Sequence, residues 1–187
     1  MLLDALKKSG VLEESDSFKR FSSPTGFSIV DVLGGDVEQD INGNPYLNWG
    51  LTNKNYMWVG ESAVGKTTMA IQLMAGSIEW WNNRYPEKDA SQFIMIDVED
   101  NTELSRIFAI TGWTPQYLKN HFSLQKMVDV TEIYNLIVNI ANEKEKNKTK
   151  YTIDTDILDI DGTPVTTWIP TYILIDSIAA MKSNVGL

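Results

Sequence analysis

The chain has 187 residues, a length that suits one domain with a substantial buried core. Its 16 basic and 25 acidic residues give a net charge of −9, which argues against a broad nucleic-acid surface but leaves room for a small basic patch. The lack of cysteine excludes disulfides and thiolate metal sites. No apolar run approaches the ~20 residues of a membrane span, and no signal-peptide pattern opens the chain, so we expect a cytoplasmic protein without a membrane partner.

Two features precede the first strong motif. We expect residues 1–21 to form an N-terminal segment of helix and linker, with the helix at residues 2–8, and residues 22–187 to form the core domain. Asn42-Gly43 lies near the middle of residues 37–49, between two strand-like runs, and this dipeptide is a common signal for a two-residue turn. The sequence therefore predicts a first β-hairpin at this point.

The most informative stretch is Gly60-Glu61-Ser62-Ala63-Val64-Gly65-Lys66-Thr67, which fits the phosphate-loop pattern G-x-x-x-x-G-K-[ST]. Residues 56–59 before it have the pattern of a buried strand, and residues 68–81, beginning with Thr68, that of an amphipathic helix. The glycines let backbone N–H groups surround anionic oxygens at a helix N-terminus. We expect Lys66 to reach the β- and γ-phosphates and Thr67 to ligate Mg²⁺. The alternative is a glycine-containing turn that binds nothing, but the context favours a nucleoside triphosphate site.

Strands and helices alternate after this loop, which predicts an α/β fold with a mainly parallel sheet. A second hairpin is predicted at residues 151–169 around Asp161-Gly162, and its alternating carboxylates are expected to be solvated because their spacing fails the Ca²⁺-loop pattern. The charged run at residues 143–150 is expected to be solvated too. The other expected elements are a strand at 92–96, a helix capped by Asp100 or Asn101, a helix at 115–119 capped by Thr114, a strand at 122–128, a helix capped by Thr131, and a strand at 171–176.

Two carboxylates stand at the ends of predicted strands. Asp176 ends an apolar strand, and because ligands of open parallel sheets bind beyond the carboxyl ends of the strands, it suits a metal-holding role. Glu99 follows the strand at 92–96, where a carboxylate could orient or deprotonate an attacking water. An acidic residue that favours the N-terminus of the next helix is an equally good interpretation of Glu99.

Several blocks, taken in order, resemble the RecA family. Residues 93–99 (Phe-Ile-Met-Ile-Asp-Val-Glu) look like its apolar strand followed by Asp-x-Glu, and residues 173–181 are similar to its Walker B segment, with a serine after the aspartate. Thr25-Gly26-Phe27, Asp31 and Leu33-Gly34-Gly35 resemble the stretch upstream of its phosphate loop. Together with the phosphate loop, these blocks resemble RecA-type recombinases, and in particular the phage UvsX-like branch, over about residues 22–181.

The resemblance implies a RecA-like P-loop NTPase with a three-layer fold, two hairpin insertions and DNA-dependent ATPase activity. Its cofactors would be ATP and Mg²⁺, and it would assemble as a homo-oligomeric filament on single-stranded DNA for strand exchange in recombination and repair, in the host cytoplasm if a phage encodes it. It implies that Glu99 is the catalytic glutamate, that Lys66 and Thr67 hold phosphate and Mg²⁺, and that Asp176 supports the metal. In this family a side chain seven residues after the glutamate packs on adenine. Here that residue is Arg106, for which an exposed helix arginine is the alternative, and Glu103 would make a weaker nucleotide contact.

The chain departs from the family pattern at its end. It stops at Leu187, eleven residues beyond Asp176, whereas the family's DNA-binding loops, its γ-phosphate sensor and a strand between the phosphate-loop strand and the Walker B strand all lie further on. We therefore expect an incomplete core, from a truncated or split product, with a gap in its sheet. Binding of single-stranded DNA is expected only for the complete protein.

Two other functions remain open from the sequence. The ATPase domain of a replicative hexameric helicase, which would form rings, is built from the same parts, although Asp-x-Glu and Asp176-Ser177 favour the recombinase. A catalytically silent partner that docks on a full-length subunit is the third possibility. The single histidine, His121, is expected to be structural, and the aromatic residues do not predict a base-stacking platform.

Overall fold

The structure is a computed structural model that describes residues 24–25, 27, 36–39, 45–48, 55–61, 63–88, 91–158 and 162–182. The predicted helix at residues 2–8 lies outside these ranges, as do Asn42-Gly43, Ser62, and most of the upstream stretch that resembles the RecA family. The rest forms a mixed α/β structure around a parallel three-stranded sheet. The predicted fold class is confirmed at this level.

The sheet consists of β3 (Gln92–Asp97), β4 (Phe122–Gln125) and β7 (Thr171–Asp176), with β3 in the centre. Both neighbours run parallel to β3. In the register of β3 with β7, Phe93 lies opposite Tyr172 and Asp97 opposite Asp176, so the two strands end at the same level. Any groups that follow these two strands are therefore brought to one edge of the sheet.

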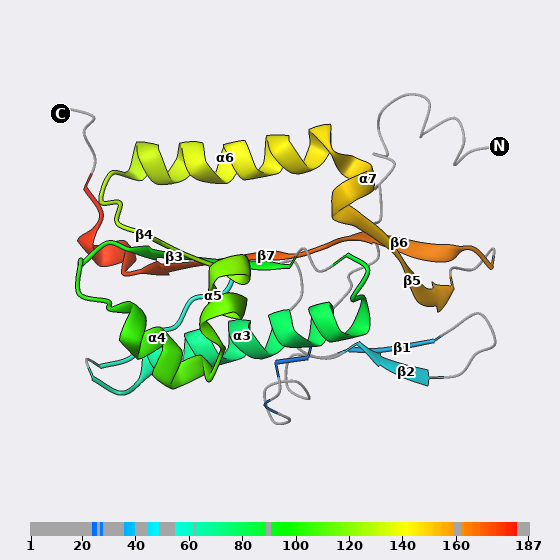
Figure 1. The fold of residues 1–187 in the computed structure, drawn as a ribbon, viewed down its shortest axis with the longest axis horizontal. Coiled ribbons are helices and arrows are strands. Elements are labelled where there is room, and N and C mark those ends of the chain that lie inside the picture. The colour runs from blue at the N-terminus through cyan, green and yellow to red at the C-terminus, as the bar shows by residue number, and fades with distance from the viewer. Residues whose placement is uncertain are drawn as a thin grey trace, which may run out of the picture.

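Helices cover both faces of the sheet (Figure 1). The long α6 (Val130–Lys146) lies on one face, and α3 (Lys66–Arg84), α4 (Leu104–Thr111) and α5 (Pro115–His121) lie on the other. The arrangement is thus three-layered. Helix α7 (Lys148–Tyr151) follows α6 and leads into β5, and the short 3₁₀ helix η1 (Ile178–Ala180) follows β7.

Alternation along β3 divides the core between these faces, because successive side chains of a strand point to opposite sides. Phe93 and Met95 are fully buried in a cluster with residues of α3, α4 and α5. Ile96 is fully buried in a second cluster with Val98 and with Ile133 of α6. Burial of large aliphatic and aromatic side chains on both faces is the main stabilisation of the sheet, at ~1.5–3 kcal/mol for each fully buried side chain.

Two antiparallel hairpins accompany the sheet. The first joins β1 (Asp36–Gln39) to β2 (Pro45–Asn48), and the second joins β5 (Thr152–Leu158) to β6 (Pro164–Trp168). In the second hairpin Gly162 has a φ of 80°, a left-handed conformation that glycine adopts without strain. The positions of both hairpins agree with the turn signals of the sequence.

The predicted strand at residues 56–59 is wrong. This segment has no regular secondary structure, and its side chains are exposed: Tyr56 to 48%, Met57 to 76%, Trp58 to 37% and Val59 to 85%. Strand-forming residues need a neighbouring strand to complete their backbone hydrogen bonds. Within the described part of the chain, the only strand that pairs with β7 is β3, and no strand pairs with the segment at 56–59.

Two helix caps also differ from the sequence analysis. Helix α4 begins after Glu103, not after Asp100 or Asn101, and no side chain caps it. Helix α6 is capped by Asp129, whose carboxylate accepts from the backbone N–H groups of Thr131 and Glu132 at 2.7 and 3.2 Å, and so Thr131 is not the cap. The predicted Thr114 cap of α5 is confirmed, with its hydroxyl accepting from the N–H of Tyr117.

His121 is buried at the end of α5, as expected of a structural residue. Its ring lies 4.2 Å, centroid to centroid, from that of Tyr117, and its Nδ1 lies 3.2 Å from the amide nitrogen of Asn82 and 3.1 Å from the carbonyl oxygen of Ser91. The charged run at 143–150 is helical, since α6 continues to Lys146 and α7 follows, and most of its side chains are exposed as expected. Across the residues described, no helix has the length and apolarity needed to cross a membrane.

Candidate functional site

The described residues of the loop between residue 60 and α3 have backbone conformations that suit an anion-binding turn. Ala63 and Gly65 both have positive φ values, 61° and 89°, and Gly65 is the N-cap of α3. No side chain caps this helix, and its first internal hydrogen bond runs from Met69 N to Gly65 O. Successive N–H groups in such a turn, together with the orphan N–H groups of the first helical turn, form a concave donor surface for anions. The described residues of the loop are exposed, so a ligand can reach them.

Lys66 folds its ammonium back over this loop. Its Nζ donates to the carbonyl oxygen of Gly60 at 2.9 Å and to that of Glu61 at 2.6 Å. Both acceptors are neutral carbonyl oxygens, and among the residues that the structure describes no carboxylate is recorded in contact with the Lys66 ammonium. A phosphate group bound in the loop would therefore lie close to the positive charge of Lys66.

Thr67 and Asp176 meet at the edge of the loop. The Thr67 hydroxyl donates to Oδ2 of Asp176 at 2.6 Å, and this contact links the first turn of α3 to the last residue of β7. Hydroxyl and carboxylate oxygens are ligands that suit Mg²⁺, which is usually held by one or two carboxylates together with phosphate oxygens and waters. The donor set therefore fits Mg²⁺ bound with a phosphate ligand. No cluster of three or more His, Cys, Asp or Glu side chains suited to a metal occurs among the described residues.

Glu99 lies beside these groups and is held from two sides. Ser177 donates its hydroxyl to Oε1 of Glu99 at 2.8 Å, and the Asn101 side-chain amide donates to Oε2 at 3.2 Å. The contact with Ser177 follows from the register of the sheet: Asp97 and Asp176 are paired, and the two residues in contact come shortly after them. Glu99 is exposed, so its carboxylate stays accessible to water and substrate.

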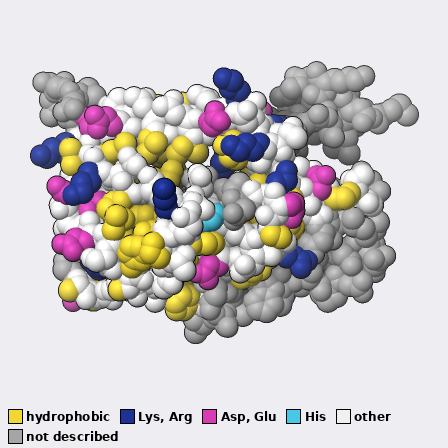
Figure 2. Space-filling view, viewed as in Figure 1, with side chains coloured by type: hydrophobic (Ala, Val, Ile, Leu, Met, Phe, Trp, Pro, Cys, Tyr) yellow, Lys and Arg dark blue, Asp and Glu magenta, His cyan; other side chains and the backbone are white. Residues whose placement is uncertain are grey.

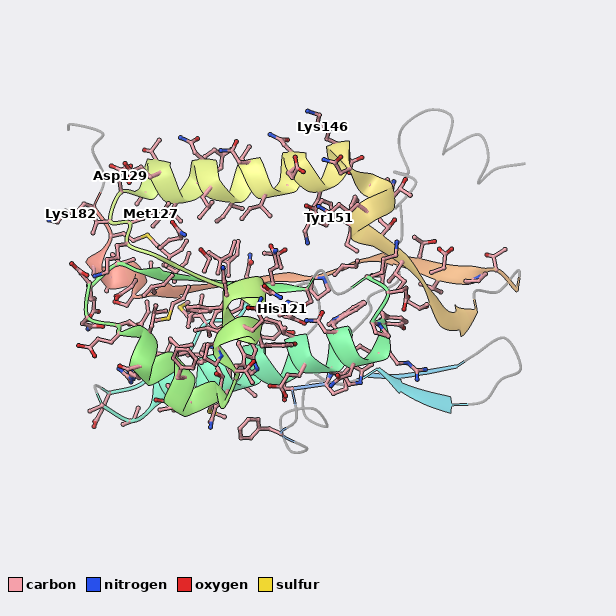
Figure 3. The ribbon with its side chains drawn as sticks, in the orientation of Figure 1. His121, Met127, Asp129, Lys146, Tyr151 and Lys182 are labelled. Carbon is pink, nitrogen blue, oxygen red and sulfur yellow. The ribbon has the colours of Figure 1, made fainter. Side chains whose placement is uncertain are left out.

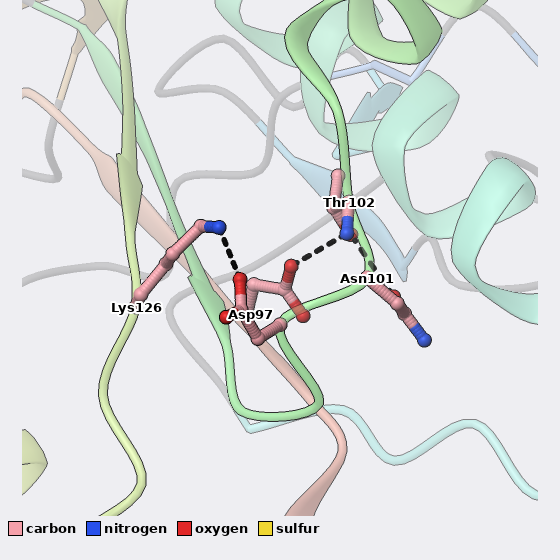
Figure 4. A network of polar contacts seen from close by, with 5 residues as sticks. Asp97, Asn101, Thr102 and Lys126 are labelled. Atoms are coloured by element: carbon pink, nitrogen blue, oxygen red, sulfur yellow. Dashed lines mark hydrogen bonds and ion pairs between the residues drawn. The ribbon is translucent and has the colours of Figure 1, made fainter.

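The turn that carries Glu99 is fixed by the network in Figure 4. Asp97 is 1% exposed and accepts from the backbone N–H of Thr102 at 2.7 Å, while its other oxygen, Oδ1, is buried without a partner. Asp100, at a φ of 54°, forms an ion pair with Lys126 beyond the end of β4. The hydrogen bond and the charge of Asp100 raise the pKa of Lys126 above its ordinary value. These contacts tie the turn to the chain on both sides of Glu99.

The two residues suggested as nucleotide contacts occupy α4. Glu103 is the N-cap residue of α4, and its Oε2 accepts from the Ser105 hydroxyl at 3.1 Å. The Arg106 guanidinium lies 3.5 Å from the Thr68 hydroxyl, so it faces the first turn of α3. Arg106 is therefore near the loop, whereas the hydrogen bond of Glu103 is local to α4.

The structure thus brings together the loop, Lys66, Thr67, Asp176 and Glu99. Ala63 and Val64 are exposed within the loop, and Ser62 lies outside the described residues. Sequence reasoning missed the roles of Ser177 and Asn101 as partners of Glu99. The signal for Ser177 was its position directly after a strand that ends in an aspartate.

Comparisons of the chain with known protein families, with curated proteins and with solved structures found no match in any of the three.

Proposed function

We propose that this chain is the ATP-binding core of a RecA/UvsX-like DNA recombinase, a P-loop NTPase that hydrolyses ATP with Mg²⁺. The observation that carries the proposal is the 2.6 Å contact between Thr67 and Asp176, which joins the phosphate-loop sequence to the Walker B-like strand. The order of the sequence blocks supports the recombinase assignment. The geometry of the loop supports the binding of a triphosphate in general.

Each residue of the site has a distinct role in this proposal. The loop N–H groups and the ammonium of Lys66 bind phosphate oxygens, and Thr67 and Asp176 hold Mg²⁺. Mg²⁺, when bound, offsets the negative charge that develops on the phosphates. The Glu99 carboxylate orients the attacking water and accepts its proton at Oε1 or Oε2. The hydrogen bonds from Ser177 and Asn101 fix the direction in which that carboxylate faces.

Nucleotide binding by single variants tests the site. Lys66→Ala is expected to abolish ATP binding in titration calorimetry, because it removes the only side-chain cation that contacts the described part of the loop. Lys119→Ala, which changes an exposed lysine of α5, is the matched control and is expected to bind normally. Equal affinities for ATP in Lys66→Ala and the parent chain would refute the proposed site.

Turnover separates binding from chemistry. Glu99→Gln keeps the size of the side chain and one acceptor oxygen for Ser177, but its amide cannot take a proton, so the variant is expected to bind ATP and fail to hydrolyse it. The recombinase assignment is tested on the complete protein, by adding single-stranded DNA and examining the assemblies by electron microscopy. Filaments and DNA-stimulated hydrolysis support it, whereas closed rings with duplex unwinding would favour the helicase.

The exposed segment Tyr56–Val59 favours a second candidate, a catalytically silent partner. A phosphate loop that follows a paired strand is held in place by the sheet, whereas the segment before this loop is not part of a sheet. The exposed apolar residues of this segment are also suited to contact another protein. Hydrolysis of ATP by the purified chain, stimulated by single-stranded DNA, would exclude this candidate. Binding to a longer recombinase subunit without turnover would support it.

A further inference from the structure

The ammonium group of Lys144 lies against the protein instead of extending into solvent. Lys144 is half-buried on α6, and its Nζ donates to the carbonyl oxygen of Ile169 at 2.5 Å. The same Nζ lies 6.0 Å from the centroid of the Tyr151 ring. Lys146, two positions further along the helix, is exposed and points away from Tyr151 on the outer side of α6 (Figure 3). These two lysines of one helix therefore have opposite environments.

No counter-charge is recorded beside Lys144 in the described part of the chain. The Ile169 carbonyl and the aromatic ring are uncharged, and no ion pair joins Lys144 to an acidic residue there. Its neighbours Glu143 and Glu145 are both exposed. An ammonium that loses water without gaining a counter-charge is destabilised relative to the neutral amine. Burial accordingly lowers the pKa of Lys144 to about 8.

A neutral amine has the free electron pair that a nucleophile needs. At pH 7 roughly one tenth of amines with the pKa of Lys144 are neutral, compared with about one in three thousand for a lysine at the ordinary value. Because the side chain is half-buried, a small electrophile reaches its nitrogen more easily than a bulky acyl group does. The position therefore suits reaction with a small, neutral electrophile.

The lysines that surround this amine give the corner a positive charge. Residues 146–151 contain three lysines and no acidic residue, in a chain with a net charge of −9. Lys150 lies over the same Tyr151 ring as Lys144, with its Nζ 4.8 Å from the ring centroid. Lys88 donates to a backbone carbonyl of α7 at 3.2 Å, and Figure 2 shows dark-blue side chains around the corner where α6 meets α7. A negative group on Lys144 would replace repulsion between like charges by attraction.

We propose that carbon dioxide reacts with Lys144 to form a carbamate, which makes this lysine a reversible modification site. The neutral Nζ donates its electron pair to the carbon of CO₂ and an N–C bond forms. One C=O π bond opens to give the carboxylate, and the nitrogen loses one proton to solvent. The carbamate nitrogen keeps one N–H, which can still donate to the carbonyl oxygen of Ile169. The ammonium of Lys150, on the same ring, stabilises the new negative charge.

This site is separate from the candidate nucleotide site. Lys144 contacts Ile169, just before the first residue of β7, whereas Asp176 is the last residue of that strand. In Figure 1 the two regions occupy opposite ends of the sheet. The inference therefore goes beyond the proposed ATPase, and its test remains valid even if the chain binds no nucleotide.

Chemical trapping tests the proposal on the parent chain. The protein is equilibrated with ¹³C-labelled CO₂ and bicarbonate, carbamates are alkylated with a trialkyloxonium salt, and the labelled peptides are identified by mass spectrometry. Label on Lys144 is expected to exceed that on Lys146 at least roughly tenfold, and to increase from pH 7 to pH 8 at constant CO₂. Peptide mapping separates it from label on the α-amino group of Met1. No label on Lys144, or equal label on Lys144 and Lys146, would overturn the proposal.

Two charge variants test the surroundings of the carbamate. Lys150→Gln is expected to lower the labelling of Lys144 about two- to threefold, the effect of one partly exposed charge. Lys182→Gln removes the same charge at the opposite end of the molecule from Tyr151 and is expected to change nothing (Figure 3). Equal labelling in the two variants would contradict stabilisation of the carbamate by Lys150.

Thermal denaturation gives an independent measurement. In the unfolded chain Lys144 has an ordinary pKa and reacts less, so CO₂ at constant pH is expected to raise the melting temperature of the parent chain. Lys144→Met should lose this rise, whereas Lys146→Met should keep it. A rise of equal size in Lys144→Met would count against the site. Labelling of Lys144 by an acyl thioester but not by CO₂ would show ordinary acylation and would also overturn the proposal.

Discussion

The hydroxyl of Thr67 donates to the carboxylate of Asp176 at 2.6 Å, although 109 positions separate the two residues in the chain. Thr67 is fixed by the first turn of α3, and Asp176 by its register with Asp97 in the sheet. Each residue is therefore positioned by a different element of secondary structure. Their contact marks the point where the loop, the helix and the sheet meet, and the proposed chemistry depends on it.

Replacement of this carboxylate by an amide tests the metal-binding role. Asp176→Asn keeps an oxygen that can accept from Thr67 but removes the negative charge, so the fold is expected to persist while Mg²⁺-dependent ATP affinity falls roughly tenfold or more. Titrations of ATP with and without Mg²⁺ measure the effect. Asp154→Asn, on the exposed face of the second hairpin, is the control for a lost charge. An unchanged Mg²⁺ dependence in Asp176→Asn would remove Asp176 from the site.

Ser177 is expected to act by positioning Glu99. In Ser177→Ala the 2.8 Å hydrogen bond is lost, and kcat for ATP hydrolysis is expected to fall by about three- to tenfold, the equivalent of one hydrogen bond, with KM unchanged. Ser105→Ala, which removes a similar bond to Glu103, is the matched control and should leave kcat unaltered. If KM rather than kcat changes in Ser177→Ala, the serine contributes to binding and not to the orientation of Glu99.

Lys144 makes stability depend on pH. Burial lowers the pKa of its ammonium to about 8 from the ordinary value of 10.5. Between these two values the unfolded chain binds more protons than the folded chain, so the contribution of Lys144 to the free energy of unfolding rises with pH through this window. Below pH 8 the buried charge destabilises the fold by at most about 3 kcal/mol.

Lys144→Met is therefore expected to raise the free energy of unfolding above that of the parent chain most strongly at neutral pH. Its advantage in the free energy of unfolding should shrink by up to about 3 kcal/mol between pH 7 and pH 10. The variant also loses the hydrogen bond to the Ile169 carbonyl, which lowers its free energy of unfolding by about 1 kcal/mol at both pH values. Urea denaturation at the two pH values measures the difference. Lys146→Met, on the same helix, should show no such change, and a pH-independent difference for Lys144→Met would contradict the assignment.

The start of α6 offers a direct comparison of two neighbouring cap candidates. Asp129→Ala removes the oxygen that accepts from two backbone N–H groups and is expected to lower the free energy of unfolding by ~1–2 kcal/mol. Thr131→Ala, at an exposed position inside the helix, is expected to change it by less than about 0.5 kcal/mol. Thermal or urea denaturation distinguishes them. The reverse order of effects would show that the helix begins at Thr131.

The sequence was sufficient for features that depend on local pattern. The apolar runs at residues 92–96 and 171–176 predicted β3 and β7, and the periodicity after the phosphate loop predicted α3. Thr114 before Pro115 predicted the start of α5, because both the cap and the proline act within one turn of helix. We also expected Asp176 to lie beside the phosphate loop, because of the family resemblance and because ligands tend to bind beyond strand ends.

Features that depend on distant partners could not be predicted in the same way. Residues 56–59 have strand-forming side chains, but strand formation also requires a neighbour, which local composition does not reveal. Asp129 caps α6 because Lys182 exchanges backbone hydrogen bonds with Val128 and Val130 and holds this stretch extended. The sequence alone could not place Lys182 there. The convergence of Lys148 with Trp168 likewise appears only once the second hairpin folds back against α7.

Pairing between β3 and β7 links the core of the protein to its proposed chemistry. A slip of one residue along this pair would turn Asp176 toward the opposite face of the sheet, away from Thr67, and would separate Glu99 from Ser177. Both contacts would then be lost together, although no side chain in them had changed. Substitutions that weaken the packing of the buried Phe93 or Met95 can therefore abolish the proposed activity without changing any residue of the site. Inactivating substitutions need not lie in the loop.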